Sequence, residues 1–176
     1  MIGKTDYQYD KNTKQKVAVF YHPDTEKVEG GIPNDFAAVA TMDGFVAEMA
    51  LSFDQAYPLK EVLRQLPDTL NVTWAFVDSE APKEAIGPIY PVYGFTIEED
   101  IEGSIDVFQE ALQVVKGSGE DEVIERMLKA KDPSFVRGVI VTGQAQNMKA
   151  LETLDIIRGA SVGVTVETKP YIEPTK

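Results

Sequence analysis

The densest group of side chains that could do chemistry is an acidic stretch in the second half of the chain. Its carboxylates belong to Glu98, Glu99, Asp100, Glu102, Asp106 and Glu110. Carboxylate oxygens bind hard cations such as calcium, but this stretch lacks the alternating ligands and central glycine of a calcium loop. Acidic residues in a first helical turn also interact favourably with the helix dipole. We therefore expect a solvated helix start, with no metal site and no catalytic carboxylate pair.

The remaining candidates for catalysis or phosphate binding have local sequences that favour structural roles. The single histidine, His22, precedes Pro23 in turn-forming sequence, so we expect no metal or general-base role for it. No serine lies in a nucleophile-elbow motif. The Gly-Ser-Gly run at 117–119 is followed by Glu120, where a phosphate loop has lysine and then serine or threonine. The sequence predicts a chain that is not an enzyme and that needs no cofactor.

Composition limits the classes of partner. The chain has 176 residues, of which 43% are hydrophobic and 26% charged, as in ordinary globular domains. Its net charge of −12 would repel phosphate backbones, so we expect no nucleic-acid binding. The absence of cysteine excludes disulfides, thiolate metal sites and cysteine nucleophiles. No apolar run approaches the length of about 18 residues that a membrane helix needs.

Two stretches of the chain repeat the same order of predicted elements, strand–helix–strand. Period-two alternation predicts the strands, and apolar residues at helical spacing predict the helices. The elements are a strand at 45–53, a helix at 59–66, a strand at 71–77, a strand at 136–142, a helix from Gln146 or Asn147, and a strand at 161–167. Two such units side by side give a sheet with helices on one face, the ferredoxin-like arrangement. The expected fold class is α+β.

The other predicted elements surround these two halves. Helices at 97–116 and 120–131 form an insertion between them, with Thr96 and Glu99 as a capping box. The apolar run Val17–Tyr21 is expected to add an edge strand. The predicted division of the chain is a flexible leader at 1–16, one domain at 17–170 and a tail at 171–176.

Two aromatic features are candidates for core or contact roles. Trp74, the only tryptophan, lies in the middle of a predicted strand. We expect it to be buried beside the apolar residues Met49, Leu51, Leu63 and Leu66. The irregular, proline-containing segment 88–95 carries Tyr90, Tyr93 and Phe95, and tyrosines are common at protein contacts. We expect this segment at the surface, in contact with a protein partner. The alternative is an aromatic loop that folds back onto the sheet.

Several short runs in the two halves carry a resemblance to a known family. They are Glu48–Asp54, Tyr57–Leu59, Leu66–Pro67, Val72–Val77, Val136–Gly143 and Val162–Val164. Over roughly residues 45–166 the chain resembles the C-terminal domain of membrane-anchored sigma-factor regulators (anti-sigma factors) of Bacillus-type bacteria. These runs are strand–helix–strand patterns with a Ser-Phe pair and a tryptophan.

The resemblance implies a sensory or partner-binding domain on the extracytoplasmic side of the cell membrane. Residues 1–16 would be the linker after a single membrane helix that is absent from this chain. An anti-sigma segment before that helix would hold the sigma factor, so this domain would reach it only indirectly. The implied partner is an envelope or membrane protein, with a homodimer as a further possibility. The alternative function is a free-standing acidic domain that binds a small molecule or peptide between its halves.

Overall fold

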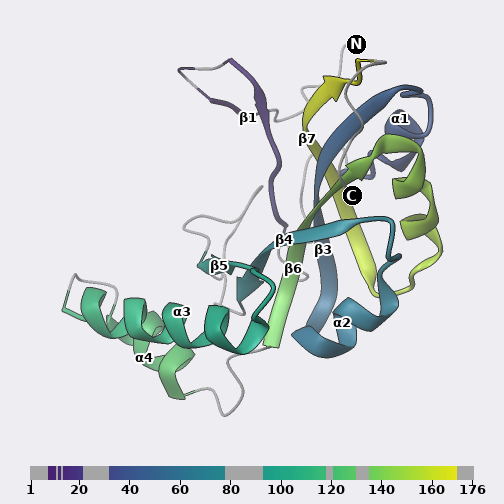
Figure 1. The fold of residues 1–176 in the computed structure, drawn as a ribbon. Helices are drawn as coiled ribbons and strands as arrows, with labels where there is room; N and C mark the ends of the chain where they lie inside the picture. The colour runs from purple at the N-terminus through teal and green to yellow at the C-terminus, as the bar shows by residue number, and fades with distance from the viewer. Residues whose placement is uncertain are drawn as a thin grey trace.

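The elements of the fold come from a computed structural model, which describes residues 8–10, 12, 14–21, 32–77, 93–117, 121–129 and 135–169 (Figure 1). The strands are β1 (Gln8–Tyr9), β2 (Lys16–Val17), β3 (Phe45–Pro58), β4 (Asn71–Val77), β5 (Gly94–Thr96), β6 (Phe135–Gln144) and β7 (Ile157–Glu167). The helices are α1 (Phe36–Val39), α2 (Leu59–Gln65), α3 (Ile101–Val115) and α4 (Asp121–Lys129), with a 3₁₀ helix η1 (Ala145–Thr153). The fold class is α+β, as predicted.

A five-stranded sheet in the order β5-β4-β6-β3-β7 organises these elements, and every neighbouring pair is antiparallel. β6 lies between β3 and β4, and β3 lies between β6 and β7. The halves β3-α2-β4 and β6-η1-β7 therefore interleave as split units. In each half a strand of the other half fills the gap and satisfies both rows of backbone groups, so the two predicted halves share one sheet.

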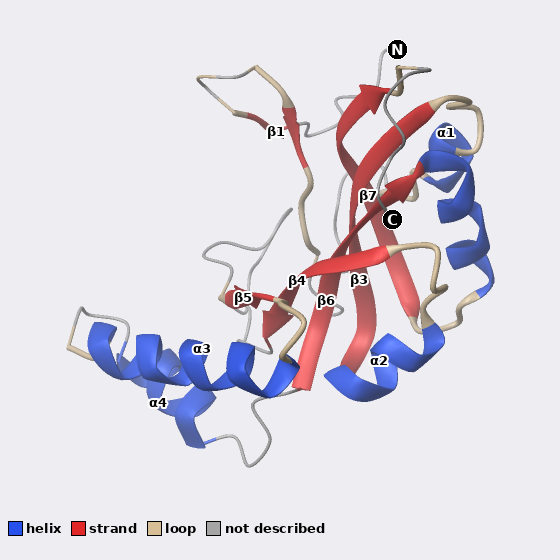
Figure 2. Cartoon of the chain, in the orientation of Figure 1, coloured by secondary structure: helices blue, strands red, loops and turns tan. Residues whose placement is uncertain are grey.

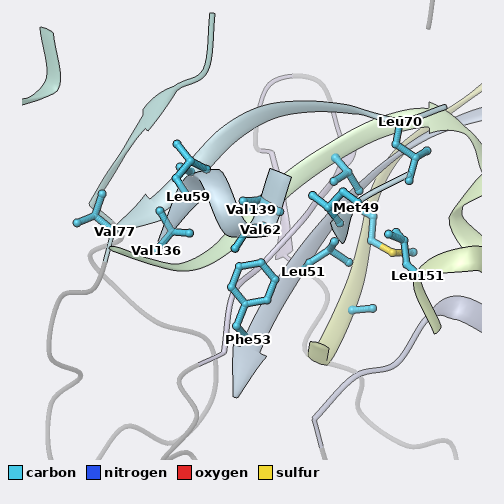
Figure 3. Packing of buried hydrophobic residues seen from close by; sticks show 14 of the residues in the cluster. Met49, Leu51, Phe53, Leu59, Val62, Leu70, Val77, Val136, Val139 and Leu151 are labelled. Carbon is cyan, nitrogen blue, oxygen red and sulfur yellow. The ribbon is translucent and has the colours of Figure 1, made fainter. Parts of the chain in front are cut away.

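One face of the sheet carries the main core. Met49, Leu51 and Phe53 alternate along β3 and are fully buried. They face Leu59 and Val62 of α2, as Figure 3 shows. The apolar sides of α1, η1, α3 and α4 contribute to the same cluster. Full burial of such a side chain contributes about 1.5–3 kcal/mol, so this cluster is a large source of stability.

The N-terminal elements differ from those predicted. β1 and β2 form a separate two-stranded ribbon in which Gln8 pairs with Val17 and Tyr9 with Lys16. The predicted edge strand at 17–21 is wrong, since the fifth strand of the sheet is β5. Residues 8–9 and Lys16 of the expected leader lie in this ribbon. Hydrogen bonds within the turn of the ribbon, such as that from the Asp10 N–H to the Gln15 carbonyl at 2.9 Å, favour the local pairing.

The insertion begins later than predicted. Asp100 caps α3, because its Oδ1 accepts the Gly103 N–H at 3.0 Å. The predicted capping box is wrong, since Thr96 belongs to β5 and pairs with Trp74 of β4. In Figure 2, α3 and α4 stand beside the sheet near β5, well away from α1.

The second half also departs in detail from its prediction. Its helix is the 3₁₀ helix η1, and β7 begins at Ile157. No helix in the described parts of the chain has the length and apolar character required to cross a bilayer.

Candidate functional site

Residues Lys16–Tyr21, here called the strap, cross the face of the sheet that the helices leave open. Their anchor is Phe20, which is 5% exposed and packs with Ala50 and Phe76. The Phe20 ring centroid lies 5.2 Å from that of Phe76 and 5.6 Å from that of Trp74. Aromatic pairs at such distances contribute about 0.5–1.5 kcal/mol beyond their buried area. In Figure 1 the purple chain runs from the β1–β2 ribbon down beside the sheet toward β4.

Two glycines in the valine-rich strands β6 and β7 make room for the strap. A Cβ at Gly138 would lie 2.8 Å from the Phe20 ring. A Cβ at Gly163 would lie 2.9 Å from the Cβ of Ala18. Both distances are shorter than real Cβ contacts, so a larger residue would clash with the strap, and also with β3, where the Leu51 carbonyl and the Glu48 carboxylate lie nearer still. A glycine inside a strand often marks such a close approach of backbone.

Polar contacts tie both ends of the strap to the sheet. At one end the Tyr21 N–H donates to the buried Ser52 Oγ at 2.9 Å. At the other end the Lys16 Nζ lies 3.2 Å from a carboxylate oxygen of Asp35, and both side chains are about four-fifths buried, with exposures of 18% and 20%. The same Asp35 oxygen accepts the Val162 N–H of β7 at 2.9 Å. The strap is therefore fixed at both ends as well as by Phe20.

The segment just before α1 protects the outer edge of β7. Asn34 pairs with Ala160 in a parallel bridge. The Asp35 N–H donates to the Ala160 carbonyl, and the Ala160 N–H donates to the Pro33 carbonyl, both at 2.9 Å. An uncovered edge would present unpaired backbone groups to other chains. This segment thus covers the edge around Ala160, and its Asp35 also receives the strap.

A half-buried carboxyl group lies beside the strap. Glu48 shares the open face of β3 with Ala50, and a Cβ at Gly163 would lie 2.6 Å from its Oε1. Burial raises the pKa of the Glu48 carboxyl above its ordinary value of 4.5, while a hydrogen bond from the Val164 backbone acts in the opposite direction. The open face therefore contains a half-buried carboxyl group whose pKa is raised by its burial.

Trp74 belongs to this open face. It is half-buried and packs with Phe20, so its predicted place in the main core is wrong. The cause is a register shift of β4 against β6 between Val72 and Trp74. Val72 packs against the main core, and the shift turns Trp74 to the opposite face.

The three aromatic residues predicted to bind a partner have different surroundings. Phe95 is buried, and its ring lies 5.2 Å from that of Phe108, so it packs inside the domain and not at the surface as predicted. Pairing of β5 with β4 turns this ring toward α3. Tyr93 is half-buried against the main core. Tyr90 lies outside the described residues, and the contact of this segment with a partner stays a prediction.

The acidic stretch does not gather into a site. Glu98, Glu99 and Asp100 are exposed, and Glu102 forms an ion pair with Lys60 of α2. Within the ranges that the structure describes, no group of three or more His, Cys, Asp or Glu side chains could hold a metal ion. His22 lies outside those ranges.

The strap itself was not predicted from the sequence. Two signals for it were present: an apolar run that ends in two aromatics at Phe20 and Tyr21, and glycines inside two valine-rich strands. A run of this kind is equally typical of an edge strand, and the glycines do not show which segment approaches them.

The comparisons with known proteins connect this fold to one family. The sequence profile described as "Sigma factor regulator C-terminal" matches residues 40–135, which is more than half of the chain. Searches of curated proteins and of solved structures gave no match. The matched residues span β3, α2, β4, β5, α3 and α4, so they include two strands of the open face that the strap covers. The chain belongs to the sigma factor regulator C-terminal family.

Proposed function

We propose that this sigma-factor regulator domain is the extracytoplasmic, sensory or partner-binding part of a membrane-anchored regulator, and that it works by binding and not by catalysis. The observation that supports a sensing role is the strap, which ties the N-terminal side of the domain to one face of the sheet. The membrane helix and the anti-sigma segment would precede the strap in the full gene product. The sigma factor would be reached only through that segment.

The strap offers a physical route from a partner to the membrane. An envelope protein that binds the open face would displace Phe20, whereas one that binds the strap would hold it in place. Burial of a phenylalanine side chain is worth about 1.5–3 kcal/mol. Coupling free energies in allosteric proteins are about 1–3 kcal/mol. A partner would therefore need only a modest preference for one state of the strap to shift it.

A strap variant in the full-length regulator tests this role. Genes whose transcripts change when the regulator is deleted define the readout. Phe20→Ala and Gly163→Val should each shift these transcripts, because both loosen the strap, while Val17→Ala at an exposed position should not. Trp74 emission of the purified domain reports whether the strap has left. If Trp74 emission shows that the strap has left in these variants and the transcripts do not change, the proposed coupling is contradicted.

The side of the membrane can be tested with a single cysteine. This chain has no cysteine, and Val166 is 55% exposed, so Val166→Cys introduces one accessible thiol. A membrane-impermeant maleimide should label the full-length variant on intact cells, with the unsubstituted strain as background. Labelling that requires lysis would show that the domain faces the cytoplasm.

The free-standing binding domain remains the alternative function. In the structure the two halves meet strand to strand, because β6 hydrogen-bonds to both β3 and β4. The coding sequence upstream distinguishes the two functions. An apolar stretch of about 20 residues would support the membrane-anchored regulator, and its absence would favour the free-standing domain.

A further inference from the structure

Helix α3 carries an apolar row that no described residue covers. Val107 is 67% exposed, Val114 84% and Val115 45%. Together with the exposed Ala111 they have the spacing of residues on one side of a helix. The buried side of α3 is formed by other residues: Ser104, Ile105, Phe108 and Leu112. Single exposed valines are ordinary, but a contiguous row is the kind of patch that marks a contact.

A row of negative charge lies beside this apolar row. Glu102, Asp106 and Glu110 are exposed and follow one another at intervals of four residues. Glu102 is paired with Lys60. Asp106 and Glu110 have no hydrogen bond or ion pair with any described residue. Both carboxylates are therefore available to positive charges on a partner.

We propose that this face of α3 binds a basic amphipathic helix of a partner protein. Its apolar residues would lie on the valine row, and its lysines or arginines would meet Asp106 and Glu110. Val107, Ala111 and Val115 form a ridge of the i±4 type, and the small Ala111 lets a second helix approach closely. The ridge is about 12 Å long, so the contact is small and suits transient binding.

Charge distinguishes this occupant from two others. A second copy of the chain would bring the same acidic row and a net charge of −12, so α3 against α3 would be repulsive. An anionic bilayer would be repelled for the same reason. A helix with lysines or arginines along its border would instead be attracted by the acidic row.

Titration of the purified chain with a synthetic helix tests the proposed contact. The probe is a labelled peptide of about 15 residues, with leucines on one face and lysines along the border. The control peptide has glutamate in place of every lysine. The lysine peptide should bind and the glutamate peptide should not. Val107→Gln with Val114→Gln should weaken binding about tenfold, whereas Val166→Gln, at an exposed valine on β7, should not. Asp106→Asn with Glu110→Gln should weaken binding and reduce its salt dependence.

Three results would overturn the proposed contact. The first is equal binding of the lysine peptide to the native chain and to the Val107/Val114 variant. The attraction would then come from charge alone, with no contribution from the valine row. The second is no binding up to about millimolar concentration. The third is a dimer in sedimentation that the valine substitutions dissociate, since a second copy would then be the occupant. None of these results bears on the strap, whose test reads transcripts and Trp74 emission.

Discussion

At the residue scale, Asp35 joins three parts of the molecule through one side chain and its backbone. Its carboxylate accepts the Val162 N–H and pairs with Lys16, while its own N–H donates to the Ala160 carbonyl. It therefore connects the strap, the segment before α1 and the edge of β7.

The two side-chain contacts of Asp35 should differ in energy. Asp35→Ala leaves the Val162 N–H without its acceptor and should lower the free energy of unfolding by about 1–3 kcal/mol. Lys16→Met keeps the apolar stem and leaves the bond between the Asp35 carboxylate and the Val162 N–H in place, so it should cost less than Asp35→Ala. Urea unfolding of both variants measures this difference. Equal losses would mean that the hydrogen bond to β7 is not the dominant contact.

Glu48 should make stability depend on pH in a defined direction. Its pKa is raised in the folded state, so the folded chain binds the proton more tightly than the unfolded chain. Stability therefore falls as pH rises from the unfolded pKa, near 4.5, through the folded pKa. Glu48→Gln removes this loss, so the stability of the variant relative to the native chain should increase with pH over that window. A flat difference for Glu48→Gln in urea unfolding at several pH values would contradict the assignment.

At the element scale, α3 is positioned by its cap as well as by its core side. Asp100 Oδ1 accepts the Gly103 N–H, and the Ser104 hydroxyl donates to the Asp100 carbonyl at 2.8 Å. The Glu98 N–H in turn donates to the Ser104 hydroxyl oxygen at 3.1 Å. These bonds determine where the helix begins and hence the direction of its exposed valine row.

Removal of the cap should lower the free energy of unfolding more than removal of a neighbouring charge does. Asp100→Ala should lower the free energy of unfolding by about 1 kcal/mol, as for other N-cap residues. Glu99→Ala, at an exposed position that caps nothing in the described structure, should change it by no more than about 0.5 kcal/mol. Thermal and urea unfolding of the two variants provide the comparison. Similar effects would indicate that only helix-dipole charge matters at this end.

At the scale of the whole molecule, the residues matched by the family profile do not contain the complete sheet. The match ends at residue 135, where β6 begins. Without β6, β3 and β4 have no common neighbour, since β6 pairs with both of them. The cooperative unit must therefore extend through β7.

A fragment of residues 40–135 should consequently fail to fold alone. It would lack β6 and β7 and their buried side chains, including Val139, Val141 and Ala160. The expected result is no cooperative transition in urea or on heating. A fragment of residues 8–169 should unfold cooperatively, with the signal of Trp74 changing in the same transition as the circular dichroism. Cooperative unfolding of the shorter fragment would show that the interleaved halves are not interdependent.

Local sequence pattern was sufficient to predict those strands and helices that have clear period-two alternation or helical spacing of apolar residues. The strand at 71–77 agrees with its prediction, and the helices at 59–66 and 120–131 agree to within two residues at each end. These signals are local, because the side of a strand or helix on which a residue lies depends on its immediate neighbours. The predicted capping box of Thr96 and Glu99 is wrong, because Thr96 pairs with β4 as part of β5. Asp100 caps the helix in its place.

The sequence by itself determined the α+β class, the main helical and strand segments and the apolar side of β3. Only the tertiary structure decided the interleaved strand order, the face that Trp74 occupies and the path of the strap. The strand order and the face of Trp74 depend on the pairing of strands far apart in the chain, including the shift of β4 against β6 between Val72 and Trp74. The strap depends on the close approach of Phe20 to Gly138, which no local pattern encodes. Non-local pairing and close packing are therefore what place the candidate site on this sheet.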